Sequence, residues 1–380
     1  MNKSRNNSQK RPRVLVAMSG GIDSAVSAYL LLRQGYEVEG AFMKNWSSTA
    51  GLKYNECPWL ADRQDALRVA AFLRLPLHTL DFERQYGQKV LAYFFREYAA
   101  GRTPNPDVMC NKEIKFKLLY DWARKRGFDY LATGHYAAIA EKSVQRSVPR
   151  GKKKPASAAR YELLRSTDEF KDQTYFIYNI RSEQLPHLLF PVGGMKKPAV
   201  RALAKKIGLP NADKRESMGL CFVGRIRLQE FLAQKLRPKP GDIVDQAGRA
   251  IGRHEGLHNY TIGQRQGIKV GATGPYYVVK KDLAANVLHV TNIPDDPALR
   301  TVAVQLHSVN WLAQPKFSGN RPARLRARFR HQGELVQVAV APLKAGVYRA
   351  AFQRPQKAVA SGQSLVLYRG RRCLGGGVIG

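Results

Sequence analysis

The first part of the chain alternates between short apolar runs and longer segments whose apolar positions have helical spacing. The apolar runs expected to form buried strands are residues 13–19, 37–44, 76–82 and 129–136. The segments expected to form helices are residues 23–35, 61–75, 88–100 and 111–127. Strands that alternate with helices form a parallel, doubly wound sheet, so an α/β domain is predicted here.

The pattern changes near residue 240. Glycines and turn signals become frequent, and short Val-rich runs of alternating polarity lie between them, as in "GATGPYYVV". Such alternation is typical of antiparallel β structure. It continues to the C-terminus, so the last 80 residues are expected to be all-β.

Residues 141–160 interrupt the regular pattern of the first part. This segment contains six basic residues before Arg160, one acidic residue and two prolines, together with several small side chains. No apolar periodicity runs through it. It is therefore interpreted as an exposed basic loop.

The overall charge of the chain indicates the kind of partner that it binds. Lysine and arginine total 63 against 29 acidic residues, and the formal net charge is +34. A balance this basic favours a polyanionic partner, with nucleic acid as the main hypothesis. The alternative is that the proteins of the source organism are basic in general, in which case the charge identifies no partner.

The ends of the chain and its cysteines bear on the compartment. No apolar run approaches the roughly 18 residues of a membrane helix. The leader, residues 1–12, is basic without an apolar core, so it is not a secretory signal. A disordered arm that touches RNA is favoured over an organelle-targeting segment. Four cysteines without a CxxC pair fit a reducing compartment.

The stretch "SGGIDS", Ser19 to Ser24, lies between the first expected strand and its helix. Its two glycines allow a sharp turn, and the amides of the turn and of the helix N-terminus form an anion site. Asp23 is a candidate Mg²⁺ ligand or helix cap. The alternative is a plain capped turn, but the position favours nucleotide binding. The stretch resembles the PP-loop of ATP pyrophosphatases, which cleave ATP between the α and β phosphates.

Two cysteines stand out by their surroundings. Cys110 ends the stretch "GRTPNPDVMC", in which two prolines predict a stiff, non-helical arm ahead of a basic helix. A thiol at a helix N-terminus has a lowered pKa and is more readily a thiolate. Cys221 lies between two glycines in "ESMGLCFVG", which indicates a bent loop. The alternative for any cysteine is a small buried apolar side chain, and Cys57 and Cys373 keep that interpretation.

The stretch "RPARLRARFR" predicts a basic strand face. Its arginines alternate with apolar residues at the strand period of two, so Arg324, Arg326, Arg328 and Arg330 are expected on one face. Like charges on one face repel unless an anion meets them, so contact with phosphates is favoured. The alternative is an ordinary solvated face.

A longer set of motifs carries a family resemblance. The motifs occur in the order "SGGIDS", "FMKNW", "GRTPNPDVMCNKEIKF", "ATGHYA", "KDQTYF", "ESMGLCF", "TIGQRQG" and "CLGGGVI". Together they resemble the tRNA-specific 2-thiouridylase family, which thiolates the wobble uridine of certain tRNAs. The resemblance runs from about Arg13 to the C-terminus. The departures are Ile22 and Thr174, where Val and Ser are usual, the basic segment 141–160 and the longer N-terminal arm.

The resemblance implies roles for individual residues. Those implied for ATP are Ala17, Met18, Ser19, Gly20, Gly21, Ile22, Asp23, Ser24, Met43 and Gly134. Those implied to lie against the target base are Asn105, Pro106 and Asp107. Those implied to contact tRNA are His135, Lys171, Asp172, Gln173, Arg328, Phe329 and Gln363. Cys110 is implied as the nucleophile and Cys221 as the carrier of a persulfide.

The implied reaction uses ATP and Mg²⁺ to adenylylate uracil O2, after which a persulfide delivers sulfur. Thiol–disulfide exchange would leave a Cys110–Cys221 disulfide, so a reductant is expected as a partner. The sulfur donor would be a sulfur-relay protein or a cysteine desulfurase. Asp107 is a candidate general acid or base, and base flipping is expected. The resemblance implies a cytoplasmic enzyme, or a mitochondrial one in a eukaryote.

The expected division of the chain follows from pattern and resemblance together. Residues 13–215 would form the PP-loop catalytic domain, 216–297 a small central domain with the second cysteine, and 298–380 a C-terminal β-barrel that binds tRNA. Rival hypotheses are an amidating synthetase, which needs an amine or a glutaminase, and a cytidine thiolase, which typically has CxxC iron–sulfur ligands. A third is an RNA chaperone that uses ATP only structurally.

Overall fold

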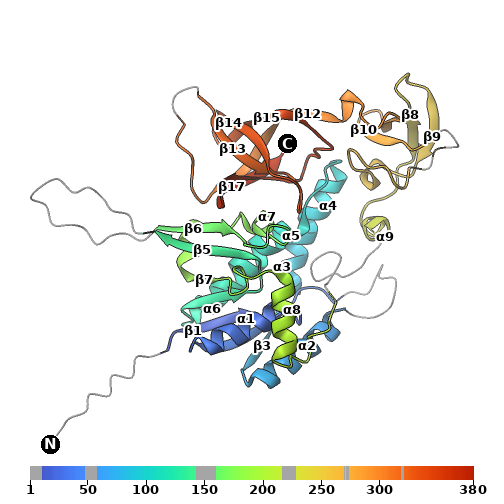
Figure 1. The fold of residues 1–380 in the computed structure, drawn as a ribbon. Helices are drawn as coiled ribbons and strands as arrows, with labels where there is room; N and C mark the ends of the chain where they lie inside the picture. The colour runs from blue at the N-terminus through green and yellow to red at the C-terminus, as the bar shows by residue number, and fades with distance from the viewer. Residues whose placement is uncertain are drawn as a thin grey trace, which may run out of the picture.

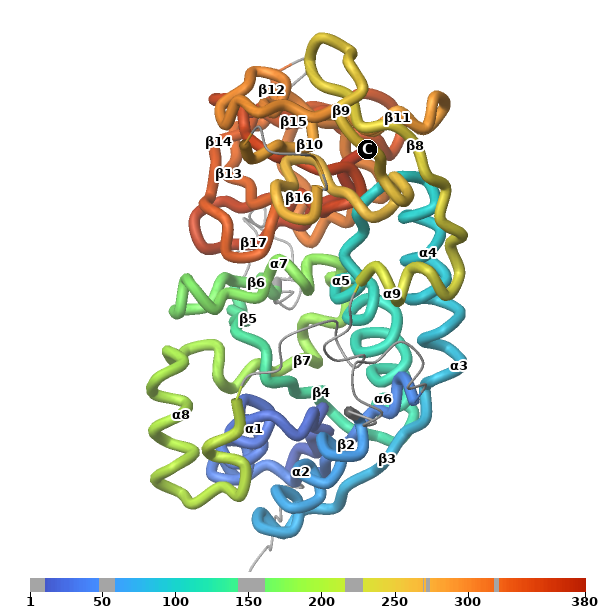
Figure 2. Tube along the Cα trace, turned by 90° about the vertical axis from the view of Figure 1, so that its right-hand side faces the viewer, coloured from blue at the N-terminus to red at the C-terminus, as the bar shows by residue number. Residues whose placement is uncertain are grey.

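The structure is a computed structural model, and it describes residues 11–47, 58–142, 160–215, 228–268, 270, 274–317 and 321–380. Three parts follow one another along the chain (Figure 1). A parallel sheet with helices lies at one end, and a β-barrel and a small β domain lie together at the other (Figures 1 and 2). Within the described residues, no helix is long and apolar enough to cross a membrane.

The first part is built on a five-stranded parallel sheet. Its strands are β1 (Arg13–Ala17), β2 (Glu37–Lys44), β3 (Leu77–Asp81), β4 (Tyr130–Thr133) and β7 (Leu188–Leu189). The strand order is β3-β2-β1-β4-β7, and every neighbouring pair is parallel. The order reverses between β1 and β4, so the predicted doubly wound sheet is confirmed, and its switch point lies between these two strands.

The apolar run of β1 is continuous because both faces of the sheet are covered. Val14 and Val16 pack into one buried cluster, whereas Leu15 and Ala17 pack into the cluster on the other face. The first face is covered by α1 (Ile22–Arg33), α2 (Pro58–Leu73) and α8 (Lys197–Lys206). The second face is covered by α3 (Glu83–Tyr86), η1 (Gly87–Leu91), α4 (Ala92–Ala99), α5 (Pro106–Cys110), η2 (Asn111–Leu119) and α6 (Tyr120–Lys125).

The proline arm differs from its prediction. Asn105 is extended, with φ −109° and ψ 100°, as expected for a residue before proline. Helix α5 begins at Pro106, however, and continues without a break into η2 and α6. Proline is tolerated at the first helical position because its missing N–H needs no partner there, and the Asn105 side chain accepts from the amides of Asp107 and Val108. The prediction of a non-helical arm is therefore wrong from Pro106 onward.

The last part is a closed six-stranded barrel, which confirms the all-β prediction. Its strands are β12 (Arg300–Trp311), β13 (Ala323–Arg328), β14 (Val336–Lys344), β15 (Val347–Lys357), β16 (Ser364–Arg369) and β17 (Arg372–Ile379). They pair antiparallel in the order β12-β15-β14-β13-β16-β17, and β12 pairs with β17 to close the barrel.

A hairpin from the first part extends this sheet. Its strands are β5 (Ala137–Lys142) and β6 (Arg160–Arg165), and β6 pairs with β17 of the barrel. Glu141, Lys142 and Arg160 were expected in a loop but belong to these strands. The rest of that expected loop, 143–159, lies outside the described residues.

The central part contains a small four-stranded sheet. Its strands are β8 (Gly241–Val244), β9 (Ala250–His254), β10 (Tyr277–Asp282) and β11 (Val287–Thr291), in the order β10-β11-β8-β9. The prediction of antiparallel pairing is wrong for β8 and β11, which run parallel. Two hairpins form the sheet, and they join along edges that run in the same direction.

Short elements complete the fold. They are α7 (Thr174–Ile177) and α9 (Leu228–Ala233), and the 3₁₀ segments η3 (Ser182–His187), η4 (Leu257–Asn259) and η5 (Pro297–Leu299).

Candidate active site

The predicted PP-loop lies at the switch point of the parallel sheet, between β1 and the start of α1. Gly20 has φ +73°, and a Cβ on it would lie 2.2 Å from the carbonyl oxygen of Asp62, so only glycine fits. Gly21 precedes α1, and no side chain caps this helix. The loop therefore combines backbone turns with a helix N-terminus suited to an anion.

Gly134 brings a second strand end against this loop. It follows β4, and a Cβ on it would lie 2.7 Å from the Ser24 amide nitrogen and 2.8 Å from the carbonyl carbon of Asp23. The absence of a side chain lets β4 approach the first turn of α1. The structure thus brings together two segments of the implied ATP site that are 110 residues apart in the sequence, 24 to 134.

Asp23 does not fit the predicted magnesium role. The Lys197 ammonium lies 2.7 and 2.8 Å from its two carboxylate oxygens, and the Tyr136 hydroxyl donates to one of them at 2.9 Å. Across the described ranges, no group of three His, Cys, Asp or Glu side chains is placed to hold a metal ion. We therefore derive no step through Mg²⁺.

Two residues near the loop were missed by the sequence analysis. Lys197 is buried at the start of α8 and is paired with Asp23. Asn45 follows β2 and is fully buried, yet neither atom of its side-chain amide has a hydrogen-bond partner in the part of the chain that is described. Asn45 lies two positions beyond Met43, which is buried on β2 as a candidate ATP contact. Asn45 falls within the motif "FMKNW", which is interpreted only for Met43, whereas no quoted motif contains Lys197.

His135, a predicted tRNA contact, is buried behind the loop. Its Nδ1 lies 2.7 Å from the Thr133 hydroxyl, and its Nε2 lies 3.5 Å from the Lys115 ammonium. Burial, and secondarily the charge of Lys115, holds its pKa well below the usual value of 6.5. The ring is therefore neutral at physiological pH and acts here as a hydrogen-bonding side chain of the interior.

The residues implied for the target base divide between two faces of one helix. Asn105, Val108, Met109 and Lys112 line a pocket of about 220 Å³ between this helix and the barrel. Their spacing of three and four positions places them on one side. Asp107 and Cys110 share the other side, where Cys110 is 1% exposed in the apolar core. The low pKa predicted for Cys110 stays a prediction.

The other cysteines divide into described and undescribed positions. Cys221 and Cys57 lie outside the described residues, so the implied pairing of Cys221 with Cys110 stays a prediction. Cys373 is buried on β17, and burial raises the pKa of its thiol to about 12. A thiol with that pKa stays protonated and unreactive.

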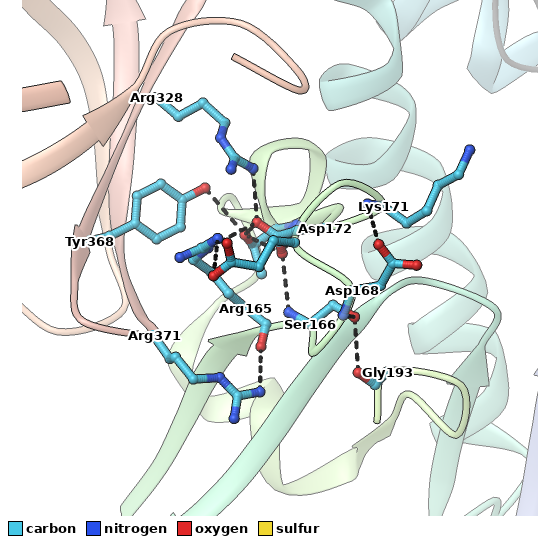
Figure 3. Close-up of polar contacts among 11 residues, drawn as sticks. Arg165, Ser166, Asp168, Lys171, Asp172, Gly193, Arg328, Tyr368 and Arg371 are labelled. Atoms are coloured by element: carbon cyan, nitrogen blue, oxygen red, sulfur yellow. Dashed lines mark hydrogen bonds and ion pairs between the residues drawn. The ribbon is translucent and has the colours of Figure 1, made fainter. Parts of the chain in front are cut away.

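A buried polar cluster joins the first part to the barrel (Figure 3). Asp172 is completely buried and accepts from the Thr174 hydroxyl at 3.0 Å and from the Ser166 amide at 3.2 Å. Arg328 of β13 donates to the same carboxylate at 3.0 Å, and Arg165 of β6 lies 3.5 Å from it. The Tyr368 hydroxyl of β16 lies 3.1 Å from that of Thr174. Asp172 is thus a shared partner for both parts.

Family comparisons agree with this architecture. The family model described as tRNA methyl transferase HUP domain matches residues 12–225. Those described as tRNA methyl transferase PRC-barrel domain and aminomethyltransferase beta-barrel domain match residues 229–292 and 302–379. A Pseudomonas aeruginosa protein named tRNA-specific 2-thiouridylase MnmA is 45% identical over 375 residues, which are 97% of this chain and 95% of that protein. The chain belongs to the tRNA-specific 2-thiouridylase family.

A second relative agrees with this membership. A protein of the same name from Bacillus licheniformis is 43% identical over 374 residues, which are 97% of this chain and 96% of that protein. A solved 4-thiouridine synthetase–RNA complex with bound ATP is 16% identical, covers 59% of this chain and 50% of that chain, and gives a TM-score of 0.36. Nothing is carried over to this chain at that low structural similarity.

Membership of the 2-thiouridylase family confirms the resemblance, while the residue roles stay predictions.

The prediction of one exposed arginine face in residues 321–330 needs a correction. Arg324 and Arg326 are exposed as expected, but Arg328 is buried against Asp172, so the four arginines do not form one exposed face. Phe329 is buried as well. The end of β13 is covered by the first part of the molecule, which a strand pattern alone does not reveal.

The remaining residues implied to contact tRNA are Lys171, Gln173 and Gln363, and they lie in three different surroundings. The Lys171 side chain points away from the polar cluster in Figure 3. The Gln173 side-chain oxygen accepts from the Tyr136 amide, and the Gln173 amide donates to the Tyr136 carbonyl oxygen, both at 2.9 Å. Gln363 donates to the carbonyl oxygen of Thr103 at 2.8 Å and accepts from the Tyr175 hydroxyl at 3.3 Å. Gln363 therefore lies beside the proline arm, close in sequence to the pocket residues Gly362 and Ser364.

Proposed function

We propose that this chain catalyses the ATP-dependent 2-thiolation of the wobble uridine of tRNA. The proposal is carried by the glycine-lined loop at the switch point, in a chain 45% identical to a 2-thiouridylase over 97% of its length. The net charge of +34 suits a tRNA substrate, because phosphate contacts with Lys and Arg dominate nucleic-acid affinity. Residues 13–215 would bind ATP and supply Cys110, residues 216–297 would supply Cys221, and the barrel of residues 298–380 would bind tRNA.

In the proposed first step, uracil O2 attacks the α phosphate of ATP and pyrophosphate leaves. O2 is a poor leaving group in the base, and adenylylation converts it into a good one. The helix N-terminus at Gly21 and the hydroxyls of Ser19 and Ser24 would meet the charge that develops on the phosphates. Asp23, held by Lys197, would fix the first turn of α1 rather than bind the nucleotide.

In the proposed second step, sulfur replaces the adenylylated oxygen at C2 and AMP leaves. In one route, the outer sulfur of a Cys221 persulfide attacks C2 and expels AMP, and the Cys110 thiolate then attacks the inner sulfur, Sγ of Cys221, which breaks the S–S bond and frees the 2-thiouridine. In the other, Cys110 attacks Sγ of the Cys221 persulfide first and releases sulfide, which then attacks C2 and expels AMP. Both routes end in a Cys110–Cys221 disulfide, so two electrons from an external reductant must restore the thiols. A persulfide donor must reload Cys221. Asp107 shares the helix face of Cys110 and is the candidate acid or base.

The proposal is tested with purified protein, unmodified tRNA, ATP and a persulfide donor. Mass spectrometry of the digested tRNA should detect 2-thiouridine, and pyrophosphate release should require tRNA. An RNA chaperone would release no pyrophosphate, and an amidating synthetase would yield no 2-thiouridine. Either result would contradict the proposal.

Replacing Gly134 with alanine should weaken ATP binding by about tenfold or more, equivalent to ~1.4 kcal/mol. The new Cβ would lie 2.7 Å from the Ser24 amide, so β4 would have to move away from α1. Isothermal titration calorimetry with ATP measures the effect. Gly87→Ala is the matched control, because Gly87 has no atoms within 4 Å of a Cβ and has a helical backbone. Equal affinities in the two variants would contradict the proposed ATP site.

A further inference from the structure

Thr103 is the point at which the three parts of the molecule meet. Its amide donates to the carbonyl of Ser361 at 2.8 Å, and its carbonyl accepts from Gln363 at 2.8 Å, both in the barrel part. Its hydroxyl lies 3.2 Å from the hydroxyl of Thr261 in the central part. All three polar atoms of this one residue are thus hydrogen-bonded outside its own domain.

Close approaches between domains at the same place involve glycines with positive φ, and at Gly362 the approach is to backbone atoms. Gly362 has φ +90°, and a Cβ on it would lie 3.0 Å from three backbone atoms of Thr103. Gly263 has φ +80° and would meet Ala358 at 2.3 Å, whereas Gly101 has φ +70° and would meet Leu283 at 2.8 Å. Each pair of domains therefore meets at a glycine with positive φ, where any other residue would be strained.

The arm is also rigid on both sides of Thr103. On one side, Arg102 makes two hydrogen bonds to the buried Glu97 of α4, at 2.6 and 3.0 Å. These bonds, more than the opposing effect of burial, lower the pKa of Glu97, so the pair stays charged. On the other side, Pro104 and Pro106 restrict the backbone up to the first turn of α5. A shift of Thr103 is therefore passed on to α5 rather than absorbed.

We propose that Thr103 is a positioning residue through which the barrel and the central domain set the position of α5. Helix α5 carries Asp107 and Cys110, so the catalytic helix is in place only when both later domains are docked on the arm. Gln363, which the family resemblance implies as a tRNA contact, would act here by holding the arm. The kinetic part of this inference rests on the proposed thiolation, whereas its structural part does not.

Gly362→Ala is the test substitution, because the three atoms nearest to the new Cβ are all backbone atoms of Thr103 in the arm. Hydrogen–deuterium exchange of the intact protein should show faster exchange of the amides at 107–112. Thiolation should lose about tenfold or more in kcat, with KM for tRNA unchanged within roughly twofold, as expected for a misplaced reacting group. The control is Gly346→Ala in the β14–β15 turn, where φ is +72° and a Cβ would meet nothing within 4 Å.

The outcomes separate this inference from the proposed function. Wild-type exchange at 107–112 in Gly362→Ala, or an equal effect of Gly346→Ala, would overturn the inference. A wild-type protein that makes no 2-thiouridine would overturn the proposed function, and the exchange comparison would still decide the role of Thr103.

A second pair of variants tests Thr103 itself by conservative rescue. Thr103→Val keeps the shape of the side chain but removes its hydrogen bond to Thr261, whereas Thr103→Ser keeps the hydroxyl. The valine variant should exchange faster at 107–112 and lose kcat, and the serine variant should remain close to wild type. Valine and serine variants that behave alike would show that the hydroxyl positions nothing.

Discussion

Replacing Cys110 with serine should reduce 2-thiouridine formation to background. The proposed reaction needs a sulfur nucleophile that can attack a persulfide and end in a disulfide, and a serine hydroxyl can do neither. Cys221→Ser should have the same effect, because it removes the group that carries the sulfur. Mass spectrometry of tRNA nucleosides measures the product, and calorimetry should show unchanged ATP affinity in both variants.

Cys373→Ser is the matched control for this result. Cys373 is also 1% exposed, and burial raises its pKa to about 12, so its thiol is expected to take no part in the chemistry. The substitution exchanges the same atoms in a buried site and should lower stability but leave thiolation in place. Thiolation retained by Cys110→Ser, or lost equally in Cys373→Ser, would contradict the two-cysteine proposal.

The parallel sheet could be predicted because its pattern is local. Val14 to Ala17 form an unbroken apolar run, and such a run is expected only where both faces of a strand are covered. Helix α8 was missed although its signal was present, with a proline in its first turn and apolar positions at Val200, Leu203 and Ala204. The β5–β6 hairpin was missed because the basic segment interrupts its short strands.

The candidate site could be predicted only where it is contiguous. The loop from Ser19 to Ser24 is a single motif, so its glycines and hydroxyls are visible in the sequence. Lys197 reaches Asp23 from 174 positions away. Asn45 is part of the motif "FMKNW", but only the structure shows that its side-chain amide is buried without a partner among the described residues. Such contacts depend on how the elements pack, and neither spacing nor composition contains that information.

The basic strand is a second example of what the sequence pattern could not predict. The period of two correctly placed Arg324 and Arg326 on an exposed face. It could not reveal that the first part of the molecule covers the next position, where Arg328 meets the carboxylate of Asp172. Periodicity identifies the face of a strand, and only the tertiary structure identifies what lies against that face.

Replacing Asp172 with asparagine should lower the free energy of unfolding by about 3–5 kcal/mol, the usual cost of breaking a buried ion pair from one side. Arg165 and Arg328 are 6% and 5% exposed, and both would lose their shared buried counter-charge. Among the described residues the Nε atom of each lacks a hydrogen-bond partner, and the other carboxylate paired with Arg165 is that of the exposed Glu169, which compensates little. Urea denaturation followed by circular dichroism measures the loss.

Glu169→Gln is the control, because it removes an exposed ion-pair partner of Arg165 instead of the buried one. Glu169 lies 3.3 Å from the same Arg165, but its side chain is 79% exposed, so its loss should cost no more than about 1 kcal/mol. Adding Arg328→Met to Asp172→Asn should recover part of the stability, because it removes one of the two uncompensated charges. Equal losses in Asp172→Asn and Glu169→Gln, or no recovery in the double variant, would show that the ion pair does not hold the barrel against the catalytic domain.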